Sequence, residues 1–291
     1  MDTCGIMKYR LVGIDLDGTL LDAHGNVSEE NRRAIAAAHE AGAMVVPCTG
    51  RGWCEARPIL ADVEGLDVGV FVTGASIVRM NTGESLDFSV IEPHLALELV
   101  RFLQNEPEAV LVYREASLAG HDYLITGKGS LTPTTQWWFE VGEMTVHFQR
   151  DVELDDLHHS LRVGLAAPGR RLPDLERRLR EAFGDRVLLH HFEAVAQPNP
   201  DEAVHILEIF ARGVDKWHGL SWLAIQHDIA PEQVAALGDE INDLSMLKAA
   251  GCGVAMGNAI DAAKACANHV TATNREHGVA VALQRMLNGE W

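Results

Sequence analysis

The chain has 291 residues, 47% of them apolar, which is enough for one large domain or a core plus a second domain. Its 24 Lys and Arg against 42 Asp and Glu give a net charge of −18, which argues against nucleic-acid or anionic-membrane binding because both need basic patches. Five cysteines without a C-x-x-C pair favour reduced thiols, and no apolar run approaches the roughly 18 residues of a membrane helix. The N-terminus carries no long apolar segment, so we expect a cytoplasmic protein.

The first predicted element is a strand over residues 11–14, followed directly by Asp15-Leu16-Asp17-Gly18-Thr19. Buried parallel strands read as apolar runs, and ligands of open α/β sheets bind beyond the carboxyl ends of the strands. Two carboxylates one residue apart suit a hard cation with oxygen ligands, and they also offer a nucleophile beside a proton donor. Taken alone, the same residues could be a polar turn that ends a strand.

Two further strands, over residues 43–47 and 67–72, alternate with two predicted helices and complete a parallel βαβαβ unit. The second strand ends in Thr49-Gly50-Arg51. A hydroxyl and backbone N–H groups at the start of a helix suit a phosphate, although an ordinary strand-to-helix turn reads the same way.

The pattern changes after the third strand. Residues 77–80 and 85–88 flank Asn-Thr-Gly-Glu and predict a hairpin. A second α/β region with more antiparallel pairing follows over about 92–196, and Gln197-Pro198-Asn199-Pro200 is predicted to be the linker back to the core.

The last third resumes the alternation of strands and helices. Residues 205–210 predict a core strand or edge piece, and Asp215 starts a helix that carries Lys216 in its first turn. The helix dipole disfavours a lysine there, so either a bound anion or simple solvation must explain it. A buried strand over residues 234–237 then ends in Gly238-Asp239-Glu240-Ile241-Asn242-Asp243, whose acids could meet Asp15 or merely cap a helix.

Together, in this order and at these element ends, the four segments resemble the four motifs of the haloacid dehalogenase superfamily of phosphatases. The long insertion between the second and third motifs makes the chain similar to the Cof-type branch. This resemblance implies an α/β fold with a doubly wound, Rossmann-like parallel sheet core over residues 1–88 and 197–291. It also implies an inserted α+β cap domain over residues 89–196 that sets substrate specificity.

The resemblance further implies Mg²⁺-dependent hydrolysis of a small phosphorylated metabolite, such as a sugar phosphate, through an aspartyl-phosphate intermediate. Asp15 would be the nucleophile and Asp17 the acid and base. The substrate phosphate would be bound by Thr49, Gly50, Lys216 and Asn242, and the metal by Asp15, Asp17, Asp239 and Asp243. We expect neither nucleic acid nor membrane as a partner, and a monomer or homodimer.

One departure and two alternatives accompany this interpretation. Thr73-Gly74-Ala75 stands where such proteins often have Asn-Gly-Ala, so a contact near the substrate could differ. A phosphomutase would use the same aspartyl-phosphate and return the phosphoryl group to its substrate. A non-catalytic protein that binds a phosphorylated metabolite would have no need of Asp15, Asp17 and Asp239 together.

Overall fold

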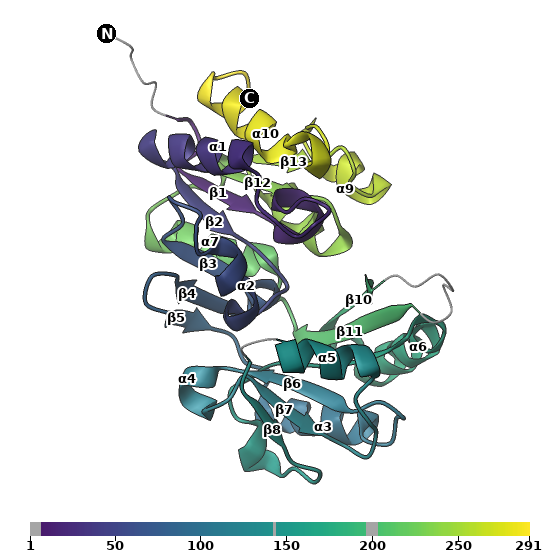
Figure 1. Ribbon diagram of the computed structural model, residues 1–291. Helices are drawn as coiled ribbons and strands as arrows, with labels where there is room; N and C mark the ends of the chain where they lie inside the picture. Colours follow the sequence, from purple (N-terminus) through teal and green to yellow (C-terminus); the bar gives the residue numbers. More distant parts are fainter. Residues whose placement is uncertain (1–6, 142–143, 196–202) are drawn as a thin grey trace. The chain divides into compact units, whose positions relative to one another are not determined.

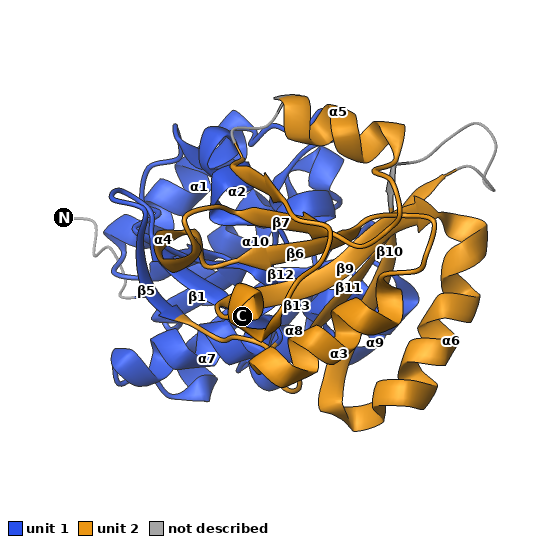
Figure 2. Ribbon diagram, turned by 90° about the horizontal axis from the view of Figure 1, so that it is seen from below, with its two compact units in different colours: residues 1–87, 215–291 blue, residues 88–214 orange. Residues whose placement is uncertain are grey.

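The structure, a computed structural model, describes residues 7–141, 144–195 and 203–291 (Figure 1). The chain divides into two compact units (Figure 2). Unit 1 comprises Met1–Asp87 and Asp215–Trp291, and unit 2 comprises Phe88–Val214. Unit 1 is therefore built from both ends of the chain, with unit 2 inserted between them.

The elements of unit 1 follow in chain order: β1 (Leu11–Ile14), α1 (Glu29–Glu40), β2 (Met44–Pro47), α2 (Trp53–Leu60), β3 (Val68–Phe71), β4 (Ser76–Arg79), β5 (Glu84–Phe88, whose last residue opens unit 2), α7 (Lys216–Gln226), β12 (Val234–Gly238), α8 (Leu244–Ala249), β13 (Cys252–Ala255), α9 (Asp261–Cys266), β14 (His269–Val270) and α10 (Gly278–Leu287).

The core of unit 1 is a five-stranded parallel sheet in the order β14-β13-β12-β1-β2. Figure 1 shows α1 and α10 side by side along one face, and α7 lies on the other. Leu220 and Leu223 of α7 pack with Leu11 and Val46 in a buried apolar cluster. The predicted doubly wound parallel core is confirmed.

Beyond β2, strand pairing changes from parallel to antiparallel. β3 meets β2 through a parallel bridge between Cys48 and Val70, and it then pairs antiparallel with β4 in a separate three-stranded sheet, β3-β4-β5. The predicted hairpin is thus present as β4 and β5.

The elements of unit 2 are: α3 (Pro93–Leu103), β6 (Val110–Arg114), α4 (Ala116–Ala119), β7 (Tyr123–Thr126), α5 (Pro133–Val141), β8 (Val146–Phe148), β9 (Ser160–Pro168), α6 (Leu172–Phe183), β10 (Val187–Val195) and β11 (Val204–Ala211). Their strands form one six-stranded sheet in the order β10-β11-β9-β6-β7-β8. All pairings are antiparallel except that of β7 with β8. Helices α3 and α6 bury their apolar faces on this sheet, so unit 2 is an α+β domain.

Unit 2 ends later than the sequence predicted. We expected residues 205–210 in the core, but β11 lies between β10 and β9 and buries Leu207 and Ile209 among the apolar residues of unit 2. The second unit therefore reaches Val214 and not residue 196. The predicted linker Gln197–Pro200 lies outside the described residues.

Within the described ranges, no helix combines the length and the apolar character needed to cross a membrane.

Candidate active site

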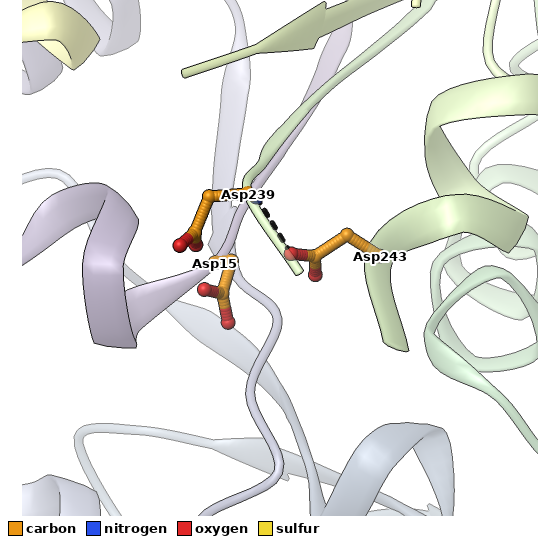
Figure 3. A group of neighbouring side chains, drawn as sticks. All are labelled: Asp15, Asp239 and Asp243. Atoms are coloured by element: carbon orange, nitrogen blue, oxygen red, sulfur yellow. Dashed lines mark hydrogen bonds between the residues drawn. The ribbon is translucent and has the colours of Figure 1, made fainter. Parts of the chain in front are cut away.

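Three aspartates meet where β1 and β12 end. These strands are parallel neighbours, with Ile14 opposite Leu237, so the residues that follow them emerge at the same edge of the sheet. Asp15 follows β1, Asp239 follows β12, and Asp243 comes from the turn before α8. One carboxylate oxygen from each lies within 4.8 Å of the other two. Figure 3 shows the three side chains reaching this point from different segments.

The turn after β1 brings its backbone against Asp239. Gly18 has φ 78°, and a methyl group there would lie 2.2 Å from Oδ2 of Asp239. Only glycine accepts both this conformation and this approach. The hydroxyl of Thr19 donates a hydrogen bond to Oδ1 of Asp239 at 2.8 Å, so the turn also fixes the orientation of that carboxylate.

Lys216 is completely buried and holds two of these aspartates. Its Nζ donates to Oδ1 of Asp15 at 2.6 Å and to Oδ1 of Asp243 at 2.5 Å. The helix α7 that carries it is capped by Asp215, whose Oδ1 accepts from the backbone N–H of His218 at 2.9 Å. The protein's own carboxylates therefore explain the lysine in the first turn, and solvation does not.

Asp243 has partners on both oxygens. Its Oδ2 accepts from the backbone N–H groups of Asp239 at 2.8 Å and of Glu240 at 2.9 Å, the first of which is the dashed line in Figure 3. The Asp243 carboxylate thus stabilises the Gly238–Asp243 turn through two backbone hydrogen bonds and joins that turn to Lys216.

Burial and the neighbouring charges shift the pKa values of the cluster. Burial, and then the charge of Asp243, hold the pKa of Asp15 well above its usual range. The same two causes raise the pKa of Asp239 to about 6. For Lys216, burial alone would lower the pKa, but the charges of Asp15 and Asp243 outweigh it and raise the value, so the ammonium stays protonated. One ammonium among three carboxylates leaves an excess of negative charge.

Apart from Lys216 on α7, the predicted phosphate-binding residues lie on two loops that approach each other. Thr49 is buried, and its Oγ1 accepts from the backbone N–H of Arg51 at 3.1 Å. A methyl group at Gly50 would lie 4.0 Å from Nδ2 of Asn242. The loop after β2 and the turn after β12 thus bring Gly50 and Asn242 close together.

Asp17 is not part of the aspartate cluster. Its carboxylate receives a two-pronged pair of hydrogen bonds from Arg51, from Nε to Oδ2 at 2.8 Å and from Nη2 to Oδ1 at 2.7 Å. The Asp17 side chain is 57% exposed. Sequence reasoning noted Arg51 only as part of its motif, and nothing in residue spacing predicts that its guanidinium binds Asp17.

Comparison with known proteins decides the family. Residues 12–283 match the model of the haloacid dehalogenase-like hydrolases. The chain belongs to this family. It is 30% identical to the phosphatase YwpJ of Bacillus subtilis over 301 residues, covering 96% of this chain and all of that one. It is 27% identical to the 5-amino-6-(5-phospho-D-ribitylamino)uracil phosphatase YwtE of the same organism, covering 97% and 99%.

Solved structures agree with this assignment. A haloacid dehalogenase-like hydrolase from Bacteroides thetaiotaomicron superposes with a TM-score of 0.76 at 27% identity, covering 96% of this chain and 99% of that one. The curated relatives are named phosphatases, so the chain is a hydrolase of phosphoric monoesters, of the Cof type within this family.

The donor set of this haloacid dehalogenase-like hydrolase fits a metal ion. The phosphatases of the family are metal-dependent, and the cluster supplies oxygen ligands only, as hard divalent cations prefer. Burial, and then the charge of Asp243, raise the pKa values of Asp15 and Asp239, so the charged forms of both carboxylates are disfavoured. A cation between them would favour the charged forms.

Like Arg51, Asn258 is a residue of the site to which sequence reasoning assigned no role. It lies in the segment after β13. Its Nδ2 donates to the backbone carbonyl of Gly18 at 2.8 Å and lies 3.5 Å from Oδ2 of Asp239. It therefore ties the turn after β1 to the segment after β13. Asn258 lies outside the four motifs read from the sequence, and no role was predicted for it.

Proposed function

We propose that the chain is a Mg²⁺-dependent phosphatase that hydrolyses a small phosphorylated metabolite through an aspartyl-phosphate on Asp15. The observation that carries this proposal is the buried Lys216, which fixes one oxygen of Asp15 beside the carboxylates of Asp239 and Asp243. An aspartate held in this way has its other oxygen available to attack phosphorus.

In the first step, that oxygen of Asp15 forms a bond to phosphorus as the ester P–O bond breaks. Asp17 donates its proton to the departing oxygen. In the second step, water attacks phosphorus, Asp17 takes its proton, and the bond to Asp15 breaks, releasing phosphate and restoring both carboxyl groups. Asp17 must leave Arg51 for these steps, because Arg51 engages both of its oxygens.

The proposed phosphate-binding residues stabilise the oxygens of the transferring group. Lys216 has three N–H donors, two of which serve Asp15 and Asp243, so one remains for a phosphoryl oxygen. The backbone N–H of Gly50, the Thr49 hydroxyl and the Asn242 amide supply the others.

Mg²⁺ would be held by the carboxylates of Asp15 and Asp239 and the backbone carbonyl of Asp17, with Asp243 close by or joined through water, and it would offset the charge of the phosphoryl group. Mg²⁺ is proposed over softer metals because no sulfur or imidazole belongs to the cluster.

We also propose that unit 2 is the cap domain, at 88–214 in place of the 89–196 predicted from sequence. The proposed catalytic residues all lie in unit 1 and address only the phosphoryl group and the metal, so the rest of the substrate must be recognised elsewhere. The proposed substrate class, a small phosphorylated metabolite, is inferred from relatives. One of them is named a 5-amino-6-(5-phospho-D-ribitylamino)uracil phosphatase, and the compound in that name is a small phosphorylated metabolite.

The test is a panel of phosphorylated sugars, nucleotides and ribityl or pyridoxal esters, assayed for phosphate release with Mg²⁺ and after dialysis against a chelator. We expect phosphate release from at least one ester with Mg²⁺ and none without it. Full turnover in chelator would exclude the metal, and conversion of a sugar phosphate to its isomer without phosphate release would identify a mutase.

A further inference from the structure

The turn after β3 is strained at the edge of the proposed phosphate site. Val72, Thr73 and Gly74 have φ values of 51°, 56° and 98°. A left-handed backbone is a genuine outlier for β-branched residues and is energetically costly. Strain of this kind persists only where the surrounding structure enforces it, and it clusters at functional sites.

Two segments of the site hold this turn in place. The backbone N–H of Thr73 donates to the carbonyl of Thr49, and that of Val72 to the carbonyl of Arg51, both at 2.9 Å. On the other side, a methyl group at Gly74 would lie 1.9 Å from the carbonyl oxygen of Asp215, immediately before Lys216. The turn is therefore clamped between the loop after β2 and the start of α7.

This conformation places a hydroxyl where the protein leaves it without a partner. Thr73 is completely buried, and among the described residues its Oγ1 has no hydrogen-bond partner. A buried polar group left unpaired destabilises the folded protein, so it calls for an explanation. Valine has nearly the same shape and would avoid that cost.

The hydroxyl lies beside groups already proposed to bind phosphate. A methyl group at Gly50 would lie 3.4 Å from Oγ1 of Thr73 and 4.0 Å from Nδ2 of Asn242. The hydroxyl and the amide thus approach the same side of Gly50, and no side chain of Gly50 separates them.

We propose that Thr73 is a further phosphate-binding residue, whose hydroxyl donates a hydrogen bond to an oxygen of the bound phosphoryl group. This inference rests on the proposed function, since the phosphoryl group is the missing partner. The strained turn then has a purpose, because it holds the donor in position before the substrate arrives.

The test compares Thr73→Val, which removes the hydroxyl, with Thr73→Ser, which keeps it. Thr271→Val is the matched control, because Thr271 is also buried in unit 1 but its Oγ1 donates to the carbonyl of Gly278 at 2.8 Å. For each variant, the melting temperature is measured with Mg²⁺, alone and over a range of inorganic phosphate concentrations that yields a dissociation constant.

We expect Thr73→Val to melt at the same temperature as the wild type or higher without phosphate, and to bind phosphate about fivefold more weakly, as for the loss of one net hydrogen bond. Thr73→Ser should stay within about twofold of the wild-type affinity, and Thr271→Val should melt lower but bind phosphate normally.

Two results would overturn this inference and leave the proposed function standing. The first is a phosphate affinity of Thr73→Val equal to that of the wild type. The second is a melting temperature of Thr73→Val lowered as much as that of Thr271→Val, which would show that the Thr73 hydroxyl has a hydrogen-bond partner within the protein. If the wild type itself showed no response to phosphate and no phosphatase activity, the proposed function would fail first and this inference with it.

Discussion

Lys216 determines the charge at the centre of the site. Its ammonium is buried between Asp15 and Asp243, and without it the three carboxylates would face one another unbalanced. A buried charge is tolerated only when it is paired and hydrogen-bonded, which is the case here. The same pairing fixes Asp15, the proposed nucleophile, and phosphoryl transfer is faster when the attacking group is held in position.

Replacing Asp15, the proposed nucleophile, gives the first prediction. Asp15→Asn should lower turnover by roughly three orders of magnitude or more, because an amide cannot attack phosphorus. Asp62→Asn, at an exposed aspartate of the same unit, is the control and should leave turnover unchanged. Activity of Asp15→Asn within tenfold of the wild type would exclude Asp15 as the nucleophile.

Asp17 gives a second prediction, which concerns the leaving group. Asp17→Asn should slow hydrolysis of an alkyl phosphate far more than that of an aryl phosphate, because only the alkoxide needs a proton as it departs. The ratio of kcat/KM for the two esters measures this difference. Equal losses for both would show that Asp17 is not the acid.

Protons should compete with the proposed cation for Asp239, which gives a third prediction. Its pKa is raised to about 6 without a metal, so it is mostly ionised at pH 7.5 and mostly protonated at pH 5. Mg²⁺ binding needs the ionised form, so affinity should fall by roughly tenfold as pH drops through 6. Calorimetric titration at the two pH values tests this, and equal affinities would contradict it.

At the scale of elements, we expect the N-cap of α7 to affect both the free energy of unfolding and kcat. Asp215 caps α7 directly before Lys216, and Ser28 caps α1 with its side chain accepting from the backbone N–H of Asn31 at 3.3 Å. Asp215→Ala and Ser28→Ala should each lower the free energy of unfolding by about 1 kcal/mol. Only Asp215→Ala should also lower kcat, because it loosens the helix end that positions Lys216. Equal kcat in the two variants would contradict this link.

The elements also show what sequence can and cannot predict. The meeting of Asp15 and Asp239 was predictable because each follows an apolar run, and parallel strands deliver such ends to one edge. Lys216 was singled out in another way, by its unfavourable place in the first turn of a helix. The place of β11 was not predictable, because its alternation of apolar residues suits either sheet and the partner strand is chosen by tertiary packing. Neither the Arg51–Asp17 pair nor the strain at Thr73 follows from residue type, since both depend on side-chain and backbone directions.

At the scale of the whole molecule, unit 2 should determine which ester is hydrolysed. Replacing residues 89–213 by a short Gly-Ser connection removes β11 together with its partners β9 and β10, whereas a cut at 196 would leave it behind. This truncated protein should still hydrolyse acetyl phosphate, while its activity on the preferred ester should fall by roughly a hundredfold more, because remote binding energy is lost.

Folding of the truncated protein must first be established by a cooperative thermal transition. If the folded protein kept the substrate ranking of the full chain, unit 2 would not be the specificity domain.

The most direct test of the account is to trap the phosphoryl group on the enzyme. Asp17→Asn mixed with Mg²⁺ and an aryl phosphate should form the aspartyl-phosphate, because an aryl leaving group departs without a proton from an acid. The variant should hydrolyse this intermediate slowly, because the Asp17 carboxylate that would take the proton of the attacking water is missing. Acid quenching followed by peptide mass analysis should find one phosphoryl group per chain on Asp15. A phosphoryl group on another residue, or aryl phosphate turnover in an Asp15→Asn, Asp17→Asn double variant equal to that of Asp17→Asn, would contradict the account.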